Sequence, residues 1–220
     1  MSNFGFVKLR AVNPYEASFH EARSAVGAAP LLKEAETFPT VAEAVADCEL
    51  VVGTTAARNR ELHQPLKTLP EAAPILRKRL GSGRVALLFG SEKRGLSNAD
   101  LSHCHWLLRI PTREGHASMN LGQAVAVCLY ELTSGRATER ARSTSPARES
   151  NKLPPARAAE LERITSLLLE ALQASGYLRK QTEVKEEKIR RMVRRLDLSA
   201  ADAEVWLGML RQIVWKLGSG

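Results

Sequence analysis

The chain contains three short, almost continuously apolar runs, each closed by a glycine or a proline. They are ELVVGT (Glu49–Thr54), RVALLF (Arg84–Phe89, before Gly90) and WLLRI (Trp106–Ile110, before Pro111). Strands without polar alternation are buried on both faces, which is typical of parallel sheets. Because segments with helical spacing separate these runs, we predict an α/β fold with a parallel sheet covered on both faces.

Local signals mark the starts of several elements. Lys8–Val12 is predicted to be a short strand. Val41–Asp47 is predicted to be a short helix, with Thr40 as its N-cap and Glu43 as the capping-box partner. Asn120–Leu132 has apolar residues at helical spacing and is predicted to pack one face against the sheet.

Composition divides the chain into two parts. Gly135–Pro155 is rich in serine, arginine, threonine and proline and has almost no large apolar side chain, so it reads as a linker. Beyond it, helices are predicted over Ala156–Ser175, over the basic segment Lys185–Leu196, and from Ser199 onward. We therefore predict an α/β domain over residues 1–135, a linker over 136–155 and a small all-α domain over 156–217.

The charge balance favours a polyanionic partner. The 220 residues carry a formal net charge of +8, and lysine and arginine gain free energy by displacing counterions from phosphates. No apolar run approaches the roughly 20 residues that span a bilayer, and no secretion signal precedes residue 10. We expect a cytoplasmic location, no membrane partner and no DNA partner.

The cysteine and histidine residues do not predict a metal site or disulfides. Cys48, Cys104 and Cys128 are odd in number and widely spaced. His103 and His105 flank Cys104, but neighbours on a strand point to opposite faces and cannot easily converge on one ion.

Two segments carry candidate chemistry. The first is FGSEKRGLS, which follows the strand RVALLF directly and has glycines at positions 90 and 95. Open α/β sheets place ligands beyond the carboxyl ends of their strands, although a glycine pair taken alone favours a plain strand-to-helix turn. The second is Ile110-Pro111, followed by Ser118-Met119-Asn120-Leu121 at a helix start. Ser118 suits an N-cap, and the amide groups of a helix start also suit a ligand carboxylate, such as that of S-adenosylmethionine.

These two segments, with GTTAARNR (Gly53–Arg60) after the preceding strand, resemble the SPOUT class of RNA methyltransferases, in the TrmH/TrmJ branch. Signatures of that branch are a glycine-glutamate-glycine-leucine loop, an isoleucine-proline strand end and a serine-leucine-asparagine helix start. In the glycine-glutamate-glycine-leucine loop the chain has Gly90, Glu92, Gly95 and Leu96. In the serine-leucine-asparagine helix start it has Met119 in place of leucine, a residue of similar volume.

The resemblance implies S-adenosylmethionine-dependent 2′-O-ribose methylation of RNA by a homodimer. It implies a trefoil knot around Gly90–Leu132, with the cofactor held by the knot. The C-terminal segments resemble the helical extension of the TrmJ-like members, which act on a pyrimidine ribose in the tRNA anticodon loop. A tRNA is therefore the expected partner.

The resemblance also implies roles for individual residues. The residues carried over as catalytic are Glu92, Ser118 and Asn120. Those carried over as cofactor-binding are Thr54, Thr55, Ala56, Gly90, Ile110, Ser118, Met119 and Leu121. Arg58 and Arg60 stand where the family has basic residues facing RNA; the alternative is that they are solvated loop charges. Arg191 and Arg194 belong to a basic helix that either contacts tRNA or is a solvated face.

The N-terminal residues depart from the family pattern. Family members have a first strand and then a helix with an arginine that is thought to activate the ribose hydroxyl. Met1–Phe6 looks like the tail of that helix, and neither Arg10 nor Arg23 matches the arginine's place. We favour a start codon assigned too far downstream. The alternative is a catalytically impaired protein that binds RNA or the cofactor.

Overall fold

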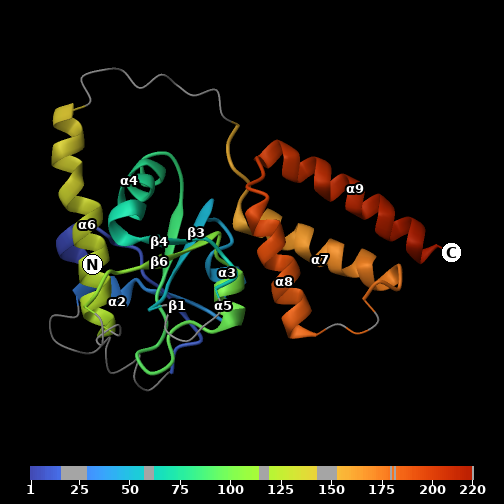
Figure 1. Ribbon diagram of the computed structural model, residues 1–220, viewed down its shortest axis with the longest axis horizontal. Helices are drawn as coiled ribbons and strands as arrows, with labels where there is room; N and C mark the ends of the chain where they lie inside the picture. Colours follow the sequence, from blue (N-terminus) through green and yellow to red (C-terminus); the bar gives the residue numbers. More distant parts are fainter. Residues whose placement is uncertain are drawn as a thin grey trace.

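The computed structural model describes residues 1–15, 29–56, 62–113, 119–142, 153–178, 180 and 182–219. An α/β part is followed by three C-terminal helices (Figure 1). The elements of the α/β part are η1 (Ser2–Phe4), β1 (Arg10–Val12), α2 (Ala29–Lys33), β2 (Glu36–Phe38), α3 (Val41–Ala44), β3 (Leu50–Thr54), β4 (Leu66–Thr68), α4 (Leu69–Leu80), β5 (Val85–Leu88), α5 (Asn98–Ser102), β6 (Trp106–Arg109) and α6 (Leu121–Arg142). The C-terminal helices are α7 (Ala158–Ala174), α8 (Glu183–Arg195) and α9 (Ala200–Gly218).

The main sheet has four parallel strands in the order β4-β6-β3-β5. Strands β3 and β6 occupy the centre, with Val52 opposite Trp106 and Thr54 opposite Leu108. Their carboxyl ends therefore lie next to each other, and β5 ends beside β3 with Leu88 opposite Gly53. The predicted parallel α/β sheet is confirmed.

Side chains of the central strands alternate between two hydrophobic cores. Leu50 and Val52 of β3 pack with Leu108 of β6 on the face that α4 and α6 cover. Val51 of β3 and Leu107 of β6 are fully buried on the opposite face, against the cluster that includes α5 and the first residue of α7. Both faces of these strands are buried, which is why the strand sequences lack polar alternation.

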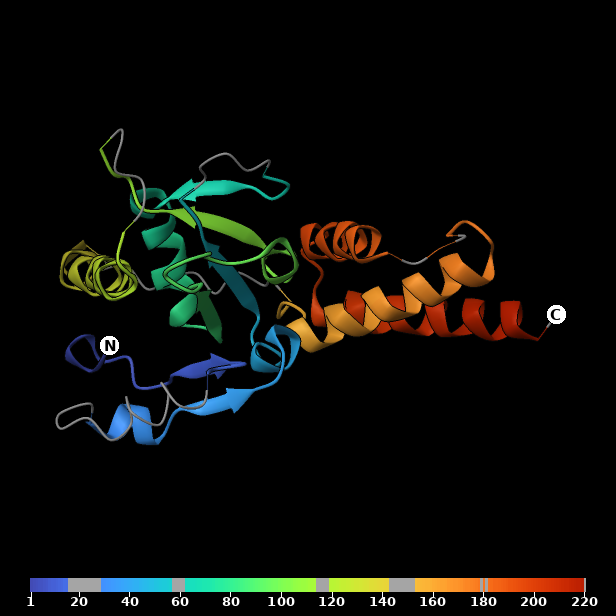
Figure 2. The same ribbon diagram turned by 90° about the horizontal axis from the view of Figure 1, so that it is seen from below.

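A second, two-stranded parallel sheet pairs β1 with β2 on one side of the molecule (Figure 2). Arg10 joins it to the main body. Its guanidinium contacts Asp47 at 2.5 Å and Glu36 at 2.8 Å and donates to the Ala44 carbonyl at 2.7 Å. The carboxylate of Asp47 holds the pKa of Arg10 above its ordinary value. Arg10 is therefore occupied by structural contacts, in line with the sequence analysis, which gave it no catalytic role.

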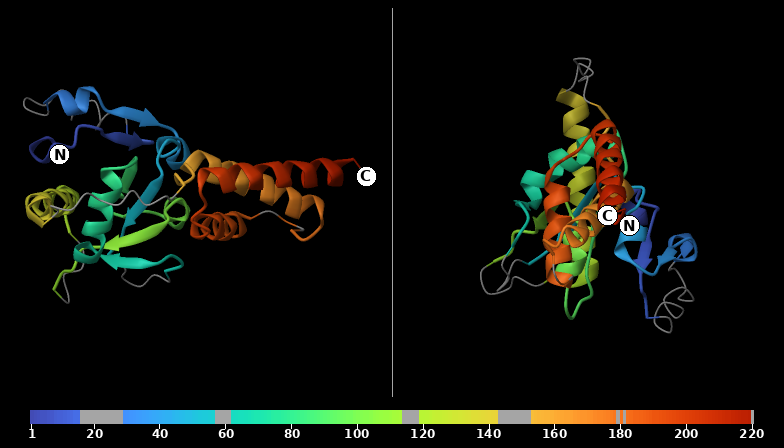
Figure 3. Two further views of the ribbon diagram at one scale, coloured as in Figure 1. Left: turned by 90° about the horizontal axis from the view of Figure 1, so that it is seen from above. Right: turned by 90° about the vertical axis from the view of Figure 1, so that its right-hand side faces the viewer.

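The three C-terminal helices extend from the end of the α/β part that lies opposite α6 (Figures 1 and 3). They share a core in which Leu161, Ile164, Val193 and Leu207 are buried. Backbone hydrogen bonds tie the first turn of α7 to the α/β part, since the Ala158 amide donates to the Cys48 carbonyl at 2.8 Å. The predicted C-terminal helices are therefore present, and they dock directly on the α/β part.

The predicted N-caps at Thr40 and Ser199 are confirmed, but two predicted helix ends are wrong, and the first is that of α3, which ends at Ala44 rather than at Asp47. The Glu43 amide donates to Thr40 Oγ1 at 3.2 Å, and the Asp202 amide donates to Ser199 Oγ at 3.1 Å, so both residues are N-caps. Helix α6, however, runs ten residues beyond Leu132, to Arg142, and includes part of the predicted linker. Alanine, arginine and glutamate in this stretch favour a helix by their intrinsic propensity.

No helix in the described part of the chain is long and apolar enough to cross a membrane.

The side chains of His103, Cys104 and His105 have different neighbours and do not converge on one point. His105 Nδ1 accepts a hydrogen bond from the Val51 amide at 3.1 Å, and burial lowers the pKa of this imidazole to about 3. His103 Nδ1 lies 3.5 Å from Glu162 Oε2, and Cys104 is fully buried in the core.

Candidate active site at the carboxyl ends of the strands

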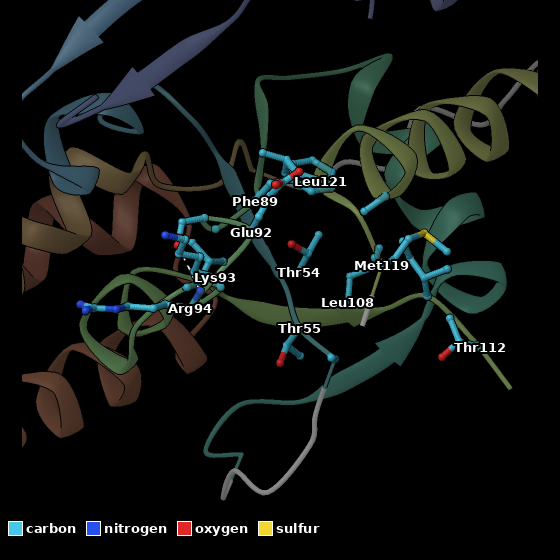
Figure 4. A pocket seen from close by; sticks show the side chains of 17 residues that line it. Thr54, Thr55, Phe89, Glu92, Lys93, Arg94, Leu108, Thr112, Met119 and Leu121 are labelled. Carbon is cyan, nitrogen blue, oxygen red and sulfur yellow. Dashed lines mark hydrogen bonds between the residues drawn. The ribbon is translucent and has the colours of Figure 1, made fainter. Parts of the chain in front are cut away.

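A cavity of about 350 Å³ lies where β3, β5 and β6 end and α6 begins (Figure 4). Strand ends, the loop after β5 and the first turn of α6 all contribute to its wall. The lining residues are Thr54, Thr55, Ala56, Phe89, Gly90, Ser91, Glu92, Lys93, Arg94, Gly95, Leu96, Leu108, Ile110, Thr112, Met119, Leu121 and Ala124.

The loop after β5, residues 90–97, folds back tightly on itself. A Cβ atom built on Gly90 would lie 1.9 Å from the Gly95 carbonyl carbon and 2.1 Å from the Leu96 nitrogen. The Gly95 amide donates to the Ser91 carbonyl at 2.8 Å, and Gly95 has a φ of 67°, in the left-handed region. Both glycines are therefore required by the backbone of this loop, which we call the cavity loop.

The end of β3 is held by both of its neighbours. Thr54 Oγ1 donates to the Leu88 carbonyl of β5 at 2.8 Å. The Thr55 amide donates to the Leu108 carbonyl of β6 at 2.9 Å. These bonds fix the strand ends that form the floor of the cavity.

Glu92 and Asn120 connect the cavity loop to α6. Asn120 Nδ2 donates to Glu92 Oε1 at 2.9 Å, and Asn120 Oδ1 accepts from the Gln123 amide at 3.3 Å, at the start of the helix. The amide of Asn120 therefore orients the carboxylate of Glu92. An ionised carboxylate accepts about four hydrogen bonds, so Glu92 can still accept a proton from a bound hydroxyl.

Most residues predicted for the cofactor site lie together. Those that line the cavity are Thr54, Thr55, Ala56, Gly90, Ile110, Met119 and Leu121, along with the predicted catalytic residue Glu92. Asn120 reaches the cavity through Glu92. Ser118, Arg58 and Arg60 lie outside the residues that the structure describes.

Four residues that line the cavity were not predicted to belong to the site. Leu108 and Ala124 belong to a predicted strand and a predicted helix, and Lys93 and Arg94 belong to the predicted loop. Their positions were the available signal, since each lies within about one helical turn of a predicted strand end or helix start.

The structure is at odds with both alternatives given for Arg191 and Arg194, contact with tRNA and a solvated face. Only 6% of the surface of Arg191 and 1% of that of Arg194 is exposed to solvent. Arg194 donates to the Ala158 carbonyl at 3.2 Å and to Glu162 Oε2 at 3.1 Å, while Arg191 pairs with Glu187 at 3.2 Å. A buried, paired guanidinium offers no surface to a phosphate, so we correct this assignment to a structural one.

The fold and the cavity together define a class of protein. It is that of α/β enzymes that hold a small-molecule ligand beyond the carboxyl ends of a parallel sheet, against a helix N-terminus.

The chain belongs to the SpoU rRNA methylase family, whose sequence model matches residues 1–130. Among its relatives, the tRNA (cytidine/uridine-2′-O-)-methyltransferase TrmJ of Klebsiella pneumoniae is 33% identical over 220 residues, covering 97% of this chain and 87% of that protein. The TrmJ of Yersinia pestis is 32% identical over 215 residues, covering 97% of this chain and 83% of that protein. The predicted enzyme class, an RNA methyltransferase of this branch, is confirmed.

Solved structures of similar proteins have the same overall fold as this chain. The crystal structure of TrmJ from Z. mobilis superposes with a TM-score of 0.80 at 30% identity, covering 97% of this chain and 89% of that chain. A probable methylase family protein from Haemophilus influenzae gives 0.58 at 27% identity, covering 99% and 88%. The similarity to TrmJ thus includes the C-terminal helices.

Proposed function

We propose that the chain transfers a methyl group from S-adenosylmethionine to a ribose 2′-hydroxyl of tRNA, at a pyrimidine of the anticodon loop. One observation carries the proposal most directly. Residues from three separate motifs, represented by Thr54, Gly90 and Met119, line one cavity. Relatives with this named activity align over 97% of the chain, the helical part included.

The cavity suits the proposed cofactor. Its volume of about 350 Å³ lies within the range of small-molecule sites. Leu108, Ile110 and Leu121 offer apolar surface for an adenine ring, and Thr54 and Thr112 offer hydroxyl groups. When bound, S-adenosylmethionine supplies a methyl group on a sulfonium centre.

The side chains of the site would orient the ribose and take its proton. Transfer needs a 2′-oxygen that is aligned with the methyl group and gives up its hydrogen. Asn120 holds the Glu92 carboxylate at 2.9 Å, at the edge of the cavity. In this proposal Glu92 accepts the hydroxyl proton or orients the hydroxyl.

The proposal includes a trefoil knot around Gly90–Leu132, a homodimer and a cytoplasmic location. The close approach of Gly90 to Gly95 fits a chain that packs tightly against itself here. The outward face of α6 carries Ala126, Val127 and Tyr130, all exposed, which suits a face that a second copy covers.

The test is methyl transfer to unmodified tRNA transcripts, with the methylated nucleosides identified by mass spectrometry. We expect 2′-O-methylated pyrimidine from the wild type. A Glu92→Gln variant, which keeps the hydrogen-bond acceptor for Asn120, should transfer about 100-fold more slowly because it loses the basic carboxylate. Its affinity for S-adenosylmethionine should stay within about twofold by calorimetry, as expected for a group that acts on the ribose.

Two experimental outcomes would contradict the proposed methyltransferase function. Binding of cofactor and tRNA by the wild type without transfer would favour the second candidate, a protein that binds RNA or cofactor without turnover. Absence of cofactor binding would contradict the proposal as a whole.

A further inference from the structure

Two cations of the cavity loop have no acidic partner among the residues that the structure describes. Lys93 and Arg94 are exposed and line the cavity, and neither forms an ion pair with a residue that the structure describes. Their acidic neighbour Glu92 bonds instead to Asn120. This contrasts with Arg194, which is buried and paired with Glu162. Charges that are left unpaired at a cavity rim are available to an anionic ligand.

The backbone that carries these cations is fixed. An antiparallel bridge joins Ser91 to Gly95, and the Arg94 amide donates to Ser91 Oγ at 3.3 Å. Gly90 packs directly under the loop. In Figure 4, Arg94 extends away from Thr54 and the cavity interior. The loop therefore holds two positive charges at the rim with little further backbone ordering required on binding.

The chemistry of the proposed substrate brings an anion to this rim. In RNA, the carbon that carries the 2′-hydroxyl adjoins the carbon that carries the 3′-phosphodiester. A ribose cannot enter the cavity by its 2′-oxygen without bringing that phosphate to the entrance. Arginine and lysine recognise such groups by charge-assisted hydrogen bonds and by release of counterions.

We propose that Lys93 and Arg94 are positioning residues that bind the phosphodiester adjacent to the ribose that is methylated. This inference rests on the proposed function. The carboxylate of the cofactor is the competing anion, but the exposure of both side chains and the outward direction of Arg94 favour the RNA.

The experiment uses the full chain with Lys93→Ala, Arg94→Ala, the double variant and the conservative Arg94→Lys. The matched control is Arg211→Ala, which removes one exposed charge from α9, in the helical part. Three quantities are measured: the tRNA Kd at several salt concentrations, the S-adenosylmethionine Kd by calorimetry, and KM and kcat for tRNA.

Each alanine variant should raise the tRNA Kd by about fivefold, the upper range for an exposed ion pair. Each should also lower the log–log salt slope by roughly one, because one phosphate contact is lost. The KM for tRNA should rise with kcat within about twofold, since binding is lost equally in ground and transition states. Arg94→Lys should regain most of the affinity, because it restores the charge, and Arg211→Ala should match the wild type.

An unchanged tRNA Kd and salt slope in a double variant that still binds S-adenosylmethionine would overturn the inference while leaving the proposed function intact. A weakened cofactor Kd in the single variants would also overturn it, by assigning the pair to the cofactor. A wild type that binds no tRNA would overturn the proposed function and this inference together.

Discussion

Gly90 is the position where the backbone of the cavity loop comes closest to itself. A methyl group there would meet the Gly95 and Leu96 backbone at 1.9 and 2.1 Å, so the loop must shift to admit it. Gly208, in the middle of α9, has open space around the same atom. A glycine-to-alanine substitution therefore meets a crowded backbone at position 90 and open space at position 208.

We predict that Gly90→Ala destabilises the protein by about 1–3 kcal/mol, the usual cost of overpacking. It should also weaken S-adenosylmethionine binding at least tenfold, or ~1.4 kcal/mol, because the shifted loop lines the cavity. Gly208→Ala should raise stability by about 0.5–1 kcal/mol, since alanine favours an exposed helix. Thermal unfolding and calorimetry measure both effects. Wild-type cofactor affinity in a folded Gly90→Ala variant would count against this cavity as the cofactor site.

At the scale of elements, α8 shows how a basic helix can serve structure. Its Arg190 and Arg194 converge on Glu162 of α7 at 3.0 and 3.1 Å, and Arg190 also donates to Ser102 of α5 at 3.1 Å. Burial by itself raises the pKa of Glu162, but contact with His103 and the charges of both arginines outweigh it and lower the pKa to about 2. This cluster fixes α7 and α8 to the α/β part.

We predict that Arg194→Ala costs about 3 kcal/mol of stability, because it removes the fully buried one of the two arginines that pair with Glu162. The salt slope of tRNA binding should not change, since Arg194 does not reach the surface. Arg163→Ala, on the exposed side of α7, should stay within about 0.5 kcal/mol of the wild type. Urea unfolding and salt titrations separate the two effects. A reduced salt slope without loss of stability would restore the RNA-binding assignment.

The same cluster gives a pH dependence with a definite sign. The folded state holds the pKa of Glu162 at about 2, below its ordinary value of 4.5. Between these values the unfolded chain binds more protons, so the contribution of Glu162 is complete above pH 4.5 and is lost as pH falls toward 2. The Arg194→Ala variant should lose less stability than the wild type over this window, and equal losses would contradict the role given to the cluster.

At the scale of the whole molecule, α6 and the three C-terminal helices lie at opposite ends of the α/β part (Figure 1). Both α6 and α9 carry an exposed valine, Val127 at 38% and Val205 at 60%. The proposed homodimer uses the α6 face, so the two positions provide a matched pair for testing it.

We predict that light scattering gives a mass of twice 24.2 kDa for the wild type. Val127→Arg should give the monomer mass at micromolar concentration, because a charge would be buried between α6 and its copy. Val205→Arg should keep the dimer mass. A monomeric wild type would contradict the dimer, and dissociation only by Val205→Arg would move the interface to α9.

The sequence by itself determined the parallel α/β sheet, the caps at Thr40 and Ser199, and most of the cavity wall. Each of these depends on residues that are close together in the chain: apolar continuity within a strand, a capping side chain three residues from its partner, or a glycine loop directly after a strand. The resemblance to the family implied that Thr54, Gly90 and Ile110 share a site, and they lie together because parallel strands end at one edge of a sheet.

Only the tertiary structure decided which charges face solvent. Composition marks α8 as basic, but the partners of Arg190 and Arg194 lie 28, 32 and 88 positions away, in Glu162 and Ser102. Helical spacing does not reveal whether a charged face meets water or a distant carboxylate, because burial depends on how whole elements pack. The same holds for Lys93 and Arg94, which form no ion pair with any described residue, while their neighbour Glu92 accepts a hydrogen bond from Asn120, 28 residues away.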